Sequence, residues 1–123
     1  MTGMPLDFET LTRLGATSKS FVAGEKVFLE DDTGSGMYLV RSGRVDIITY
    51  GTVLENVRAG GIFGEIALID DGPRSAAAIA AEASEVISID KAAFLALVRE
   101  QPEFALHVMR LLTARLRKMN QHL

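Results

Sequence analysis

Short apolar segments separated by turn residues occupy the middle of the chain, from about residue 21 to residue 89. Such runs are typical of β-strands, and many of them at regular spacing predict a sandwich, a barrel or a roll. Ser42-Gly43 predicts a tight hairpin between two of these strands. The expected strands are Val27–Leu29, Met37–Val40, Val45–Tyr50, Val53–Val57, Ala76–Ala81 and Val86–Ile89.

The hydrophobic spacing is helical at both ends of the chain. Apolar residues within Leu6–Leu14 predict a short amphipathic helix that Gly15 ends. Asp90 is a good N-cap for a later helix, and Gln101-Pro102 separates that helix from a second one. The second helix carries an apolar face, with basic residues in its C-terminal half. The pattern therefore predicts a mainly β fold with a short N-terminal helix and two C-terminal helices, at about 90–121.

The composition fits one ordinary globular domain that spans residues 1–123. Hydrophobic residues make up 48% and charged residues 24% of the chain, and the absence of cysteine excludes disulfides and thiolate metal sites. The net charge of −3 gives no strong basic face for nucleic acid. The aliphatic runs are too short to span a membrane, and the N-terminus does not read as a signal peptide. We therefore expect a cytoplasmic protein.

One segment, Gly60–Ala76, concentrates residues suited to holding a ligand. Glycines precede a one-turn helix candidate at Glu65–Ile69, and such a start exposes backbone N–H groups that suit an anion. Arg74 can hold a phosphate through two parallel hydrogen bonds, and Ser75 adds a hydroxyl donor. Glu65 would repel a phosphate but can accept a hydrogen bond from a sugar hydroxyl.

Two interpretations of this segment stay open on the residues alone. Its side chains suit a phosphorylated sugar with a free hydroxyl group. They suit equally well a structural role, in which glycine-containing turns lie beside a surface ion pair between Glu65 and Arg74.

Two parts of the segment, Phe63-Gly64-Glu65-Ile66-Ala67-Leu68 and Pro73-Arg74-Ser75-Ala76, resemble the phosphate-binding cassette of cyclic-nucleotide-binding domains. That family includes the catabolite activator protein, the regulatory subunits of cyclic-AMP-dependent kinase and cyclic-nucleotide-gated channels. Further segments that match in the same order are Ala23–Phe28, Met37–Val45 and Arg115–Arg117. The resemblance implies a β-roll, a double-stranded β-helix of the jelly-roll kind, over about 21–89.

The resemblance also implies roles in phosphate and sugar binding. Glu65 would accept a hydrogen bond from the ribose 2′-hydroxyl, Arg74 would pair with the cyclic phosphate, and Ser75 would also reach the phosphate. Backbone groups of the cassette would complete the site. The other cassette residues in this prediction are Phe63, Gly64, Ile66, Ala67 and Ala76.

The base of the ligand needs an apolar surface and a lid. Ile47 and Leu54 are the candidates for the surface, with plain core packing as the alternative. Met119 and Asn120 lie where the resemblance implies a lid. Basic residues of the same helix could cover the base instead, or simply form a solvated face: Arg115, Arg117 and Lys118.

The expected function is that of a cyclic-nucleotide sensor. Cyclic AMP is the expected ligand and cyclic GMP the alternative, because Ser75 leaves the selectivity open. Ligand binding would move the C-terminal helices. The apolar stripe of the last helix, formed by Val108, Leu112, Leu116 and Met119, could then contact a second copy or a partner protein.

Three rivals come from other classes. An enzyme or metal site is not expected, since His107 and His122 lie far from the cassette and no nucleophile–base pair is evident. Direct nucleic-acid binding is not expected either, because no helix-turn-helix follows the last helix before Leu123. The chain could still be a fragment of a regulator or channel. A ligand-free interaction module is the third rival, and the presence of Glu65 and Arg74 argues against it.

Overall fold

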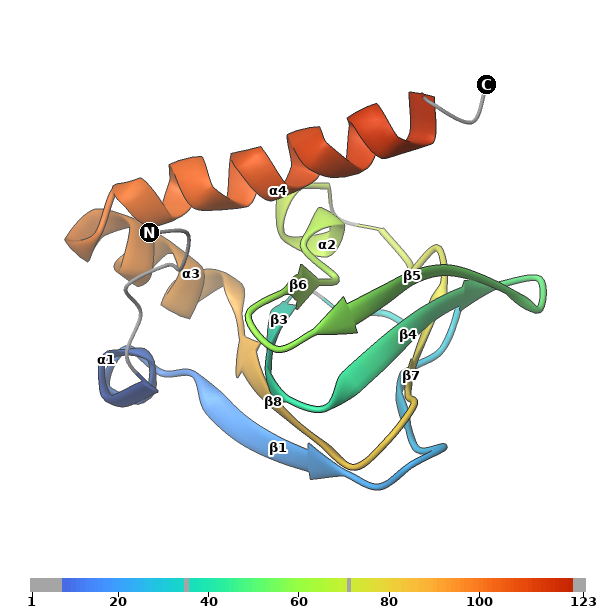
Figure 1. The fold of residues 1–123 in the computed structure, drawn as a ribbon. Coiled ribbons are helices and arrows are strands. Elements are labelled where there is room, and N and C mark those ends of the chain that lie inside the picture. Colours follow the sequence, from blue (N-terminus) through green and yellow to red (C-terminus); the bar gives the residue numbers. More distant parts are fainter. Residues whose placement is uncertain (1–7, 35, 71, 121–123) are drawn as a thin grey trace.

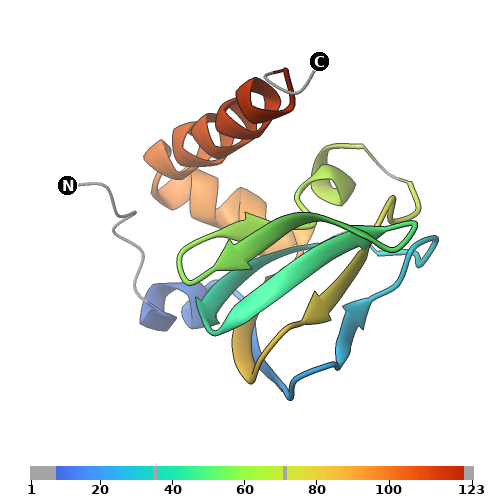
Figure 2. The same cartoon turned by 45° about the vertical axis from the view of Figure 1, so that its right-hand side comes forward.

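The computed structural model describes residues 8–34, 36–70 and 72–120, apart from the side chain of residue 119. Two four-stranded sheets, ordered β1-β8-β3-β6 and β2-β7-β4-β5, form an antiparallel roll. Helices α3 and α4 lie together at one end of it (Figures 1 and 2). The strands are β1 Thr17–Phe21, β2 Lys26–Phe28, β3 Met37–Ser42, β4 Arg44–Thr49, β5 Thr52–Arg58, β6 Ile62–Phe63, β7 Ala77–Ala80 and β8 Ser84–Ile89. The helices are α1 Phe8–Arg13, α2 Ile66–Ile69, α3 Lys91–Glu100 and α4 Glu103–Asn120.

The predicted fold class is confirmed, and each expected strand has a counterpart among β2, β3, β4, β5, β7 and β8. The hydrophobic pattern did not reveal β1 and β6. β1 pairs with β8 at the edge of its sheet, and its residues are exposed apart from a half-buried Phe21. An exposed edge strand needs no apolar alternation. β6 has two residues, which is too short to show a period.

The expected hairpin at Ser42-Gly43 is wrong. β3 pairs with β8 and β6, whereas β4 pairs with β5 and β7, so this turn carries the chain from one sheet to the other. Gly43 has a φ of +89°, and a Cβ atom there would lie 2.3 Å from the Ser84 hydroxyl oxygen. The corner therefore needs glycine both for its backbone conformation and for the close approach of β8.

Two hydrophobic cores meet at β6. Phe63 packs in the core inside the roll, together with Val45. Its neighbour Ile62 packs in the other core, under Leu97 and Phe104 of the C-terminal helices. Successive side chains of a strand point to opposite faces, and burying each large apolar side chain stabilises the fold by roughly 1.5–3 kcal/mol. β6 thus anchors the start of the cassette to both layers.

The C-terminal helices begin as predicted. Asp90 caps α3, since its side chain accepts a hydrogen bond of 2.8 Å from the Ala93 N–H. Pro102 stands just before α4. The first half of α4 packs through the buried Phe104 and Val108, and its second half is more exposed. This second half reaches the mouth of the roll, where the candidate site lies.

Candidate ligand-binding site

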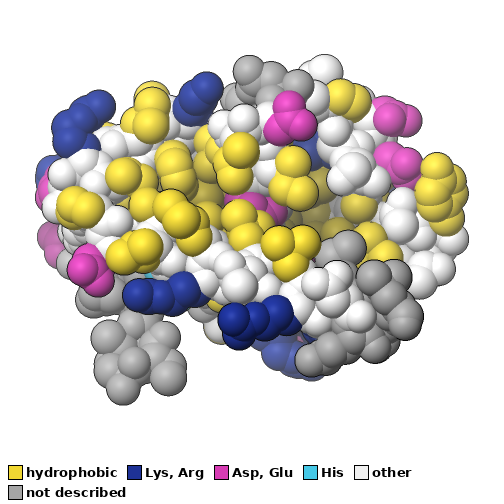
Figure 3. Space-filling view, turned by 90° about the horizontal axis from the view of Figure 1, so that it is seen from above, with side chains coloured by type: hydrophobic (Ala, Val, Ile, Leu, Met, Phe, Trp, Pro, Cys, Tyr) yellow, Lys and Arg dark blue, Asp and Glu magenta, His cyan; other side chains and the backbone are white. Residues whose placement is uncertain are grey.

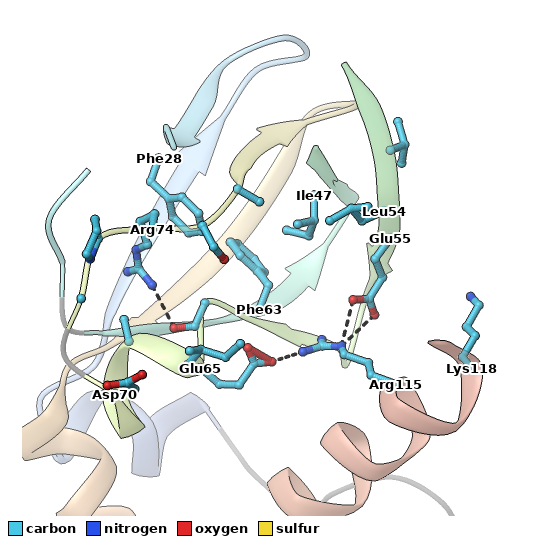
Figure 4. A pocket seen from close by; sticks show the side chains of 18 residues that line it. Phe28, Ile47, Leu54, Glu55, Phe63, Glu65, Asp70, Arg74, Arg115 and Lys118 are labelled. Carbon is cyan, nitrogen blue, oxygen red and sulfur yellow. Dashed lines mark hydrogen bonds and ion pairs between the residues drawn. The ribbon is translucent and has the colours of Figure 1, made fainter. Parts of the chain in front are cut away.

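A pocket of about 570 Å³ opens between the β4–β5 hairpin, the segment around α2 and the C-terminal half of α4 (Figure 4). Its volume lies within the range of small-molecule sites. Ten residues singled out in the sequence line it: Ile47, Leu54, Phe63, Gly64, Glu65, Ile66, Ala67, Arg74, Ser75 and Ala76. The fold therefore brings the cassette and the expected apolar surface to one cavity.

Of the two predicted lid residues, only Asn120 has a side chain that the structure describes. Asn120 is exposed at the end of α4 and is not among the described residues that line the pocket. Met119 is in α4, but its side chain is outside the described part of the structure. Instead, α4 contributes Arg115 and Lys118 to the pocket wall. The role of residues 119 and 120 as a lid stays a prediction.

Gly64 makes the turn from β6 into α2 possible. Its φ is +75°, in the left-handed region that favours glycine. A Cβ atom at this position would also lie 3.0 Å from Nη1 of Arg74 and 3.4 Å from the Phe28 ring. Gly64 is therefore required both by the backbone and by the packing of Arg74.

Arg74 is fixed inside the pocket wall, with 7% of its surface exposed. Its Nη1 and Nη2 donate hydrogen bonds of 2.9 Å to the carbonyl oxygens of Gly64 and Gly36. The guanidinium carbon lies 4.3 Å from the centre of the Phe28 ring, a cation–π distance. Burial lowers the pKa of Arg74, and the nearby Tyr38 opposes that shift, so the side chain stays charged. A guanidinium has five N–H donors, so the two bonds to carbonyl oxygens do not use all of them.

Glu65 forms its ion pair with α4. It is 4% exposed, and its Oε1 accepts a hydrogen bond from Nη1 of Arg115. Nε of Arg115 lies 2.8 Å from Glu55 on β5, and its Nη2 donates to the Ile62 carbonyl oxygen. The surface ion pair between Glu65 and Arg74 is therefore wrong, because both side chains are buried and each has other partners. Figure 4 shows Arg115 between the two carboxylates.

The rest of the pocket wall is largely apolar. Ile47 on β4 is half-buried, whereas Val53 and Leu54 on β5 are 48% and 58% exposed. These exposed aliphatic side chains can pack against the face of a flat ring. Core packing, the alternative weighed for Leu54, does not fit this exposure.

Sequence reasoning missed two of the lining residues that matter here, Phe28 and Glu55. Phe28 was seen only as part of a strand, because its cationic neighbour Arg74 is distant in the sequence. Glu55 follows Leu54 on β5, in a strand of mixed polar and apolar residues that does not mark it. No local pattern could have revealed either contact.

A model of the family described as "Cyclic nucleotide-binding domain" matches residues 18–101, which include Glu65 and Arg74. The chain belongs to the cyclic nucleotide-binding domain family. One relative is the "Cyclic AMP receptor protein" of Thermus thermophilus, which is 35% identical over 105 residues, 81% of this chain and 49% of the relative. The chain spans about half the length of the curated relatives it matches first. The second of them, from Mycobacterium tuberculosis, is 30% identical over 108 residues and is named "CRP-like cAMP-activated global transcriptional regulator".

Solved structures of this family have the same fold. The Thermus thermophilus catabolite activator protein is 31% identical, has a TM-score of 0.79, and is matched over 96% of this chain and 59% of that one. A second structure, from work on "a cyclic-GMP-dependent signalling pathway" in bacterial phytopathogenesis, is 25% identical with a TM-score of 0.76. The match covers 94% of both chains. The printed names thus mention cyclic AMP for one relative and a cyclic-GMP-dependent pathway for one solved structure.

No helix in the described ranges is long and apolar enough to cross a membrane. Among the same residues, no group of three or more histidine or acidic side chains is placed to hold a metal ion. His107 is half-buried on α4 outside the pocket wall, and His122 lies outside the described residues.

Proposed function

We propose that the pocket binds a purine 3′,5′-cyclic nucleotide, with cyclic AMP as the first candidate and cyclic GMP as the alternative. The observation that carries this proposal is that a buried guanidinium, Arg74, and a buried carboxylate, Glu65, line one pocket. A cation beside an acceptor matches a ligand that carries a phosphate next to a sugar hydroxyl. The name of the Thermus relative supports cyclic AMP.

The phosphate would lie on Arg74, which has donors beyond those that bond to Gly64 and Gly36, with the Ser75 hydroxyl beside it. The backbone of Gly64 and Ala76 borders the same place, and the first N–H groups of α2, at Ile66 and Ala67, have no intrahelical acceptor. Such groups stabilise an anion at short range. This arrangement leaves the sugar and the base on the side of the pocket away from Arg74.

The sugar and base would extend from Glu65 toward the β4–β5 hairpin. Glu65 gives one oxygen to Arg115 and keeps acceptor capacity for the 2′-hydroxyl. The base would lie on Ile47 and Leu54, with the end of α4 above it. Apolar contact with a ring stabilises binding without selecting among purines.

Arg115 supports a role as a sensor. It connects α4 to the carboxylate that would receive the ligand's hydroxyl. A ligand that contacts Glu65 therefore alters the ion pair that holds α4 against the roll. The equilibrium between two positions of α4 shifts only by as much as the ligand binds one position more tightly than the other. Identical amide spectra for α4 with and without ligand would exclude this movement.

The outer face of α4 supports contact with a second copy of the chain. The expected stripe is wrong in part, because Val108 is buried and Leu112 packs against the core. The exposed residues Leu106, Met109 and Leu116 are instead 45%, 56% and 60% exposed and follow the spacing of a coiled-coil seam. Figure 3 looks onto this side of the molecule and shows hydrophobic side chains running across it. A partner protein with a complementary helix is the alternative occupant.

The experiment is a calorimetric titration of the wild-type protein with cyclic AMP and with cyclic GMP. Saturable one-to-one binding of either nucleotide would support the proposal, and 5′-AMP serves as the control that lacks the cyclic phosphate. No heat from either cyclic nucleotide, in protein shown to be folded, would favour the ligand-free interaction module instead. Whether the chain acts inside a longer regulator or channel is a separate proposal, suggested by its match to half of its relatives.

A further inference from the structure

The end of the pocket opposite Arg74 contains a second cation. Figure 4 shows Arg74 and Lys118 at opposite ends, with Glu65 between them. If the phosphate lies on Arg74 and the sugar on Glu65, as proposed above, the base must lie at the Lys118 end. Lys118 lines the pocket from α4, one turn beyond Arg115 and on the same helix face.

The two basic residues of α4 that line the pocket, Arg115 and Lys118, differ in whether their charged groups already have partners. Arg115 is occupied, because its three nitrogens contact Glu55, Glu65 and the Ile62 carbonyl oxygen. For the Lys118 ammonium, no partner is found in the part of the chain that the structure describes. Lys118 is therefore the charged group at this end that can turn to a ligand.

An ammonium group has three donors and no acceptor. One edge of guanine presents two acceptors, O6 and N7, whereas the same edge of adenine presents the N7 acceptor beside the N6 amino donor. A donor-only side chain therefore matches guanine and opposes the amino group of adenine. Removing such a charged hydrogen bond typically changes affinity about tenfold.

We propose that Lys118 is a specificity-determining residue that reads O6 of the purine and raises the affinity for cyclic GMP relative to cyclic AMP. This inference rests on the proposed function, and it concerns the ratio of the two affinities. It makes the pocket a site for both nucleotides, in which Lys118 supplies the contact that distinguishes them.

The test compares three ligands in wild-type protein and in Lys118→Met. The third ligand is cyclic IMP, which has O6 and N7 but lacks the 2-amino group of guanine. We expect Lys118→Met to lose about tenfold more affinity for cyclic GMP and cyclic IMP than for cyclic AMP. Methionine keeps roughly the length of the side chain. The lost charge weakens the attraction to the phosphate of all three ligands alike, so this effect cancels in the ratio of their affinities.

Arg117→Met is the matched control, because Arg117 carries the same charge on α4 but does not line the pocket among the described residues. It should leave all affinity ratios unchanged. An equal loss for all three ligands in Lys118→Met would overturn the assignment while leaving the proposed function intact. A loss confined to cyclic GMP, with cyclic IMP behaving as cyclic AMP, would also overturn it, because the 2-amino group would then be the part that is read. Absence of binding to the wild type would overturn the proposed function itself.

Discussion

Arg115 of α4 forms an ion pair with Glu65, the buried carboxylate that we propose as the acceptor for the sugar hydroxyl. The same arginine contacts Glu55 on β5 and the carbonyl oxygen of Ile62 on β6. One side chain thus joins the C-terminal helix to both sheets of the roll and to the cassette. The ligand site and the element expected to move are thus joined at Arg115, which allows specific predictions about each.

Loss of Arg115 should release α4. Arg115→Met leaves the buried Glu65 without its cationic partner, and breaking such a pair destabilises a protein by about 3–5 kcal/mol when both groups are fully buried. Arg115 is 25% exposed, so we expect a smaller loss. Amide hydrogen exchange should show faster exchange in the second half of α4. Arg117→Met, on the exposed side, should leave exchange unchanged, and equal protection in all three proteins would contradict the link.

Replacement of Arg74 by lysine should weaken binding by at least about tenfold. Lysine keeps the charge but loses the planar fork and cannot make both bonds to Gly64 and Gly36 while it holds a phosphate. Calorimetry with cyclic AMP measures the loss. Arg58→Lys is the matched control, since Arg58 is exposed on β5 and outside the described pocket wall. Unchanged affinity in Arg74→Lys would argue against phosphate binding at this position.

Gly64→Ala should reduce both affinity and stability. Gly64 and Gly51 both have a φ of +75°, so alanine at either position strains the backbone by about 1 kcal/mol. Only at position 64 would the new Cβ press on Arg74, because nothing lies within 4 Å of the Gly51 position. Thermal unfolding should therefore show a loss in both variants, and ligand titration a loss in Gly64→Ala alone. A similar affinity loss in Gly51→Ala would contradict this explanation.

The exposed stripe of α4 predicts self-association. Leu116→Glu places a charge on the most exposed residue of the proposed seam, where it would remain without a partner. Analytical ultracentrifugation should show a dimer for the wild type and a monomer for the variant. Leu95→Glu changes an equally apolar residue, 48% exposed on α3, and should leave the dimer intact. A monomeric wild-type protein with or without ligand would indicate that another partner covers the stripe.

Much of the roll could be predicted from the sequence because its strands obey a local rule. Segments such as Met37–Val40 are apolar, short and bounded by turns, and Asp90 marks a helix start by a contact three residues away. The change of sheet at Gly43 could not be predicted, since a tight turn inside one sheet and a corner between two sheets use the same residues. The distinction depends on Ser84, which lies far along the chain.

In the candidate site too, local features could be predicted from the sequence, whereas contacts between distant residues could not. Glu65 and Arg74 stand in one contiguous motif, and the pocket contains both. Their partners do not follow from the motif, because Arg115 is 50 residues from Glu65 and the Gly36 carbonyl is 38 residues from Arg74. On the residues alone, an ion pair between Glu65 and Arg74 was one of two open interpretations. Tertiary packing instead gave each a separate set of partners and buried both.

The most direct test of the account is the 2′-hydroxyl contact at Glu65, measured by titrating cyclic AMP and 2′-deoxy cyclic AMP into wild-type protein and into Glu65→Met. Methionine keeps the length of the side chain but offers no carboxylate, and Glu55 remains as a partner for Arg115. The account predicts that removal of the hydroxyl weakens binding about tenfold in the wild type and hardly at all in the variant. The same loss in both proteins, or no binding of cyclic AMP to the wild type, would contradict it.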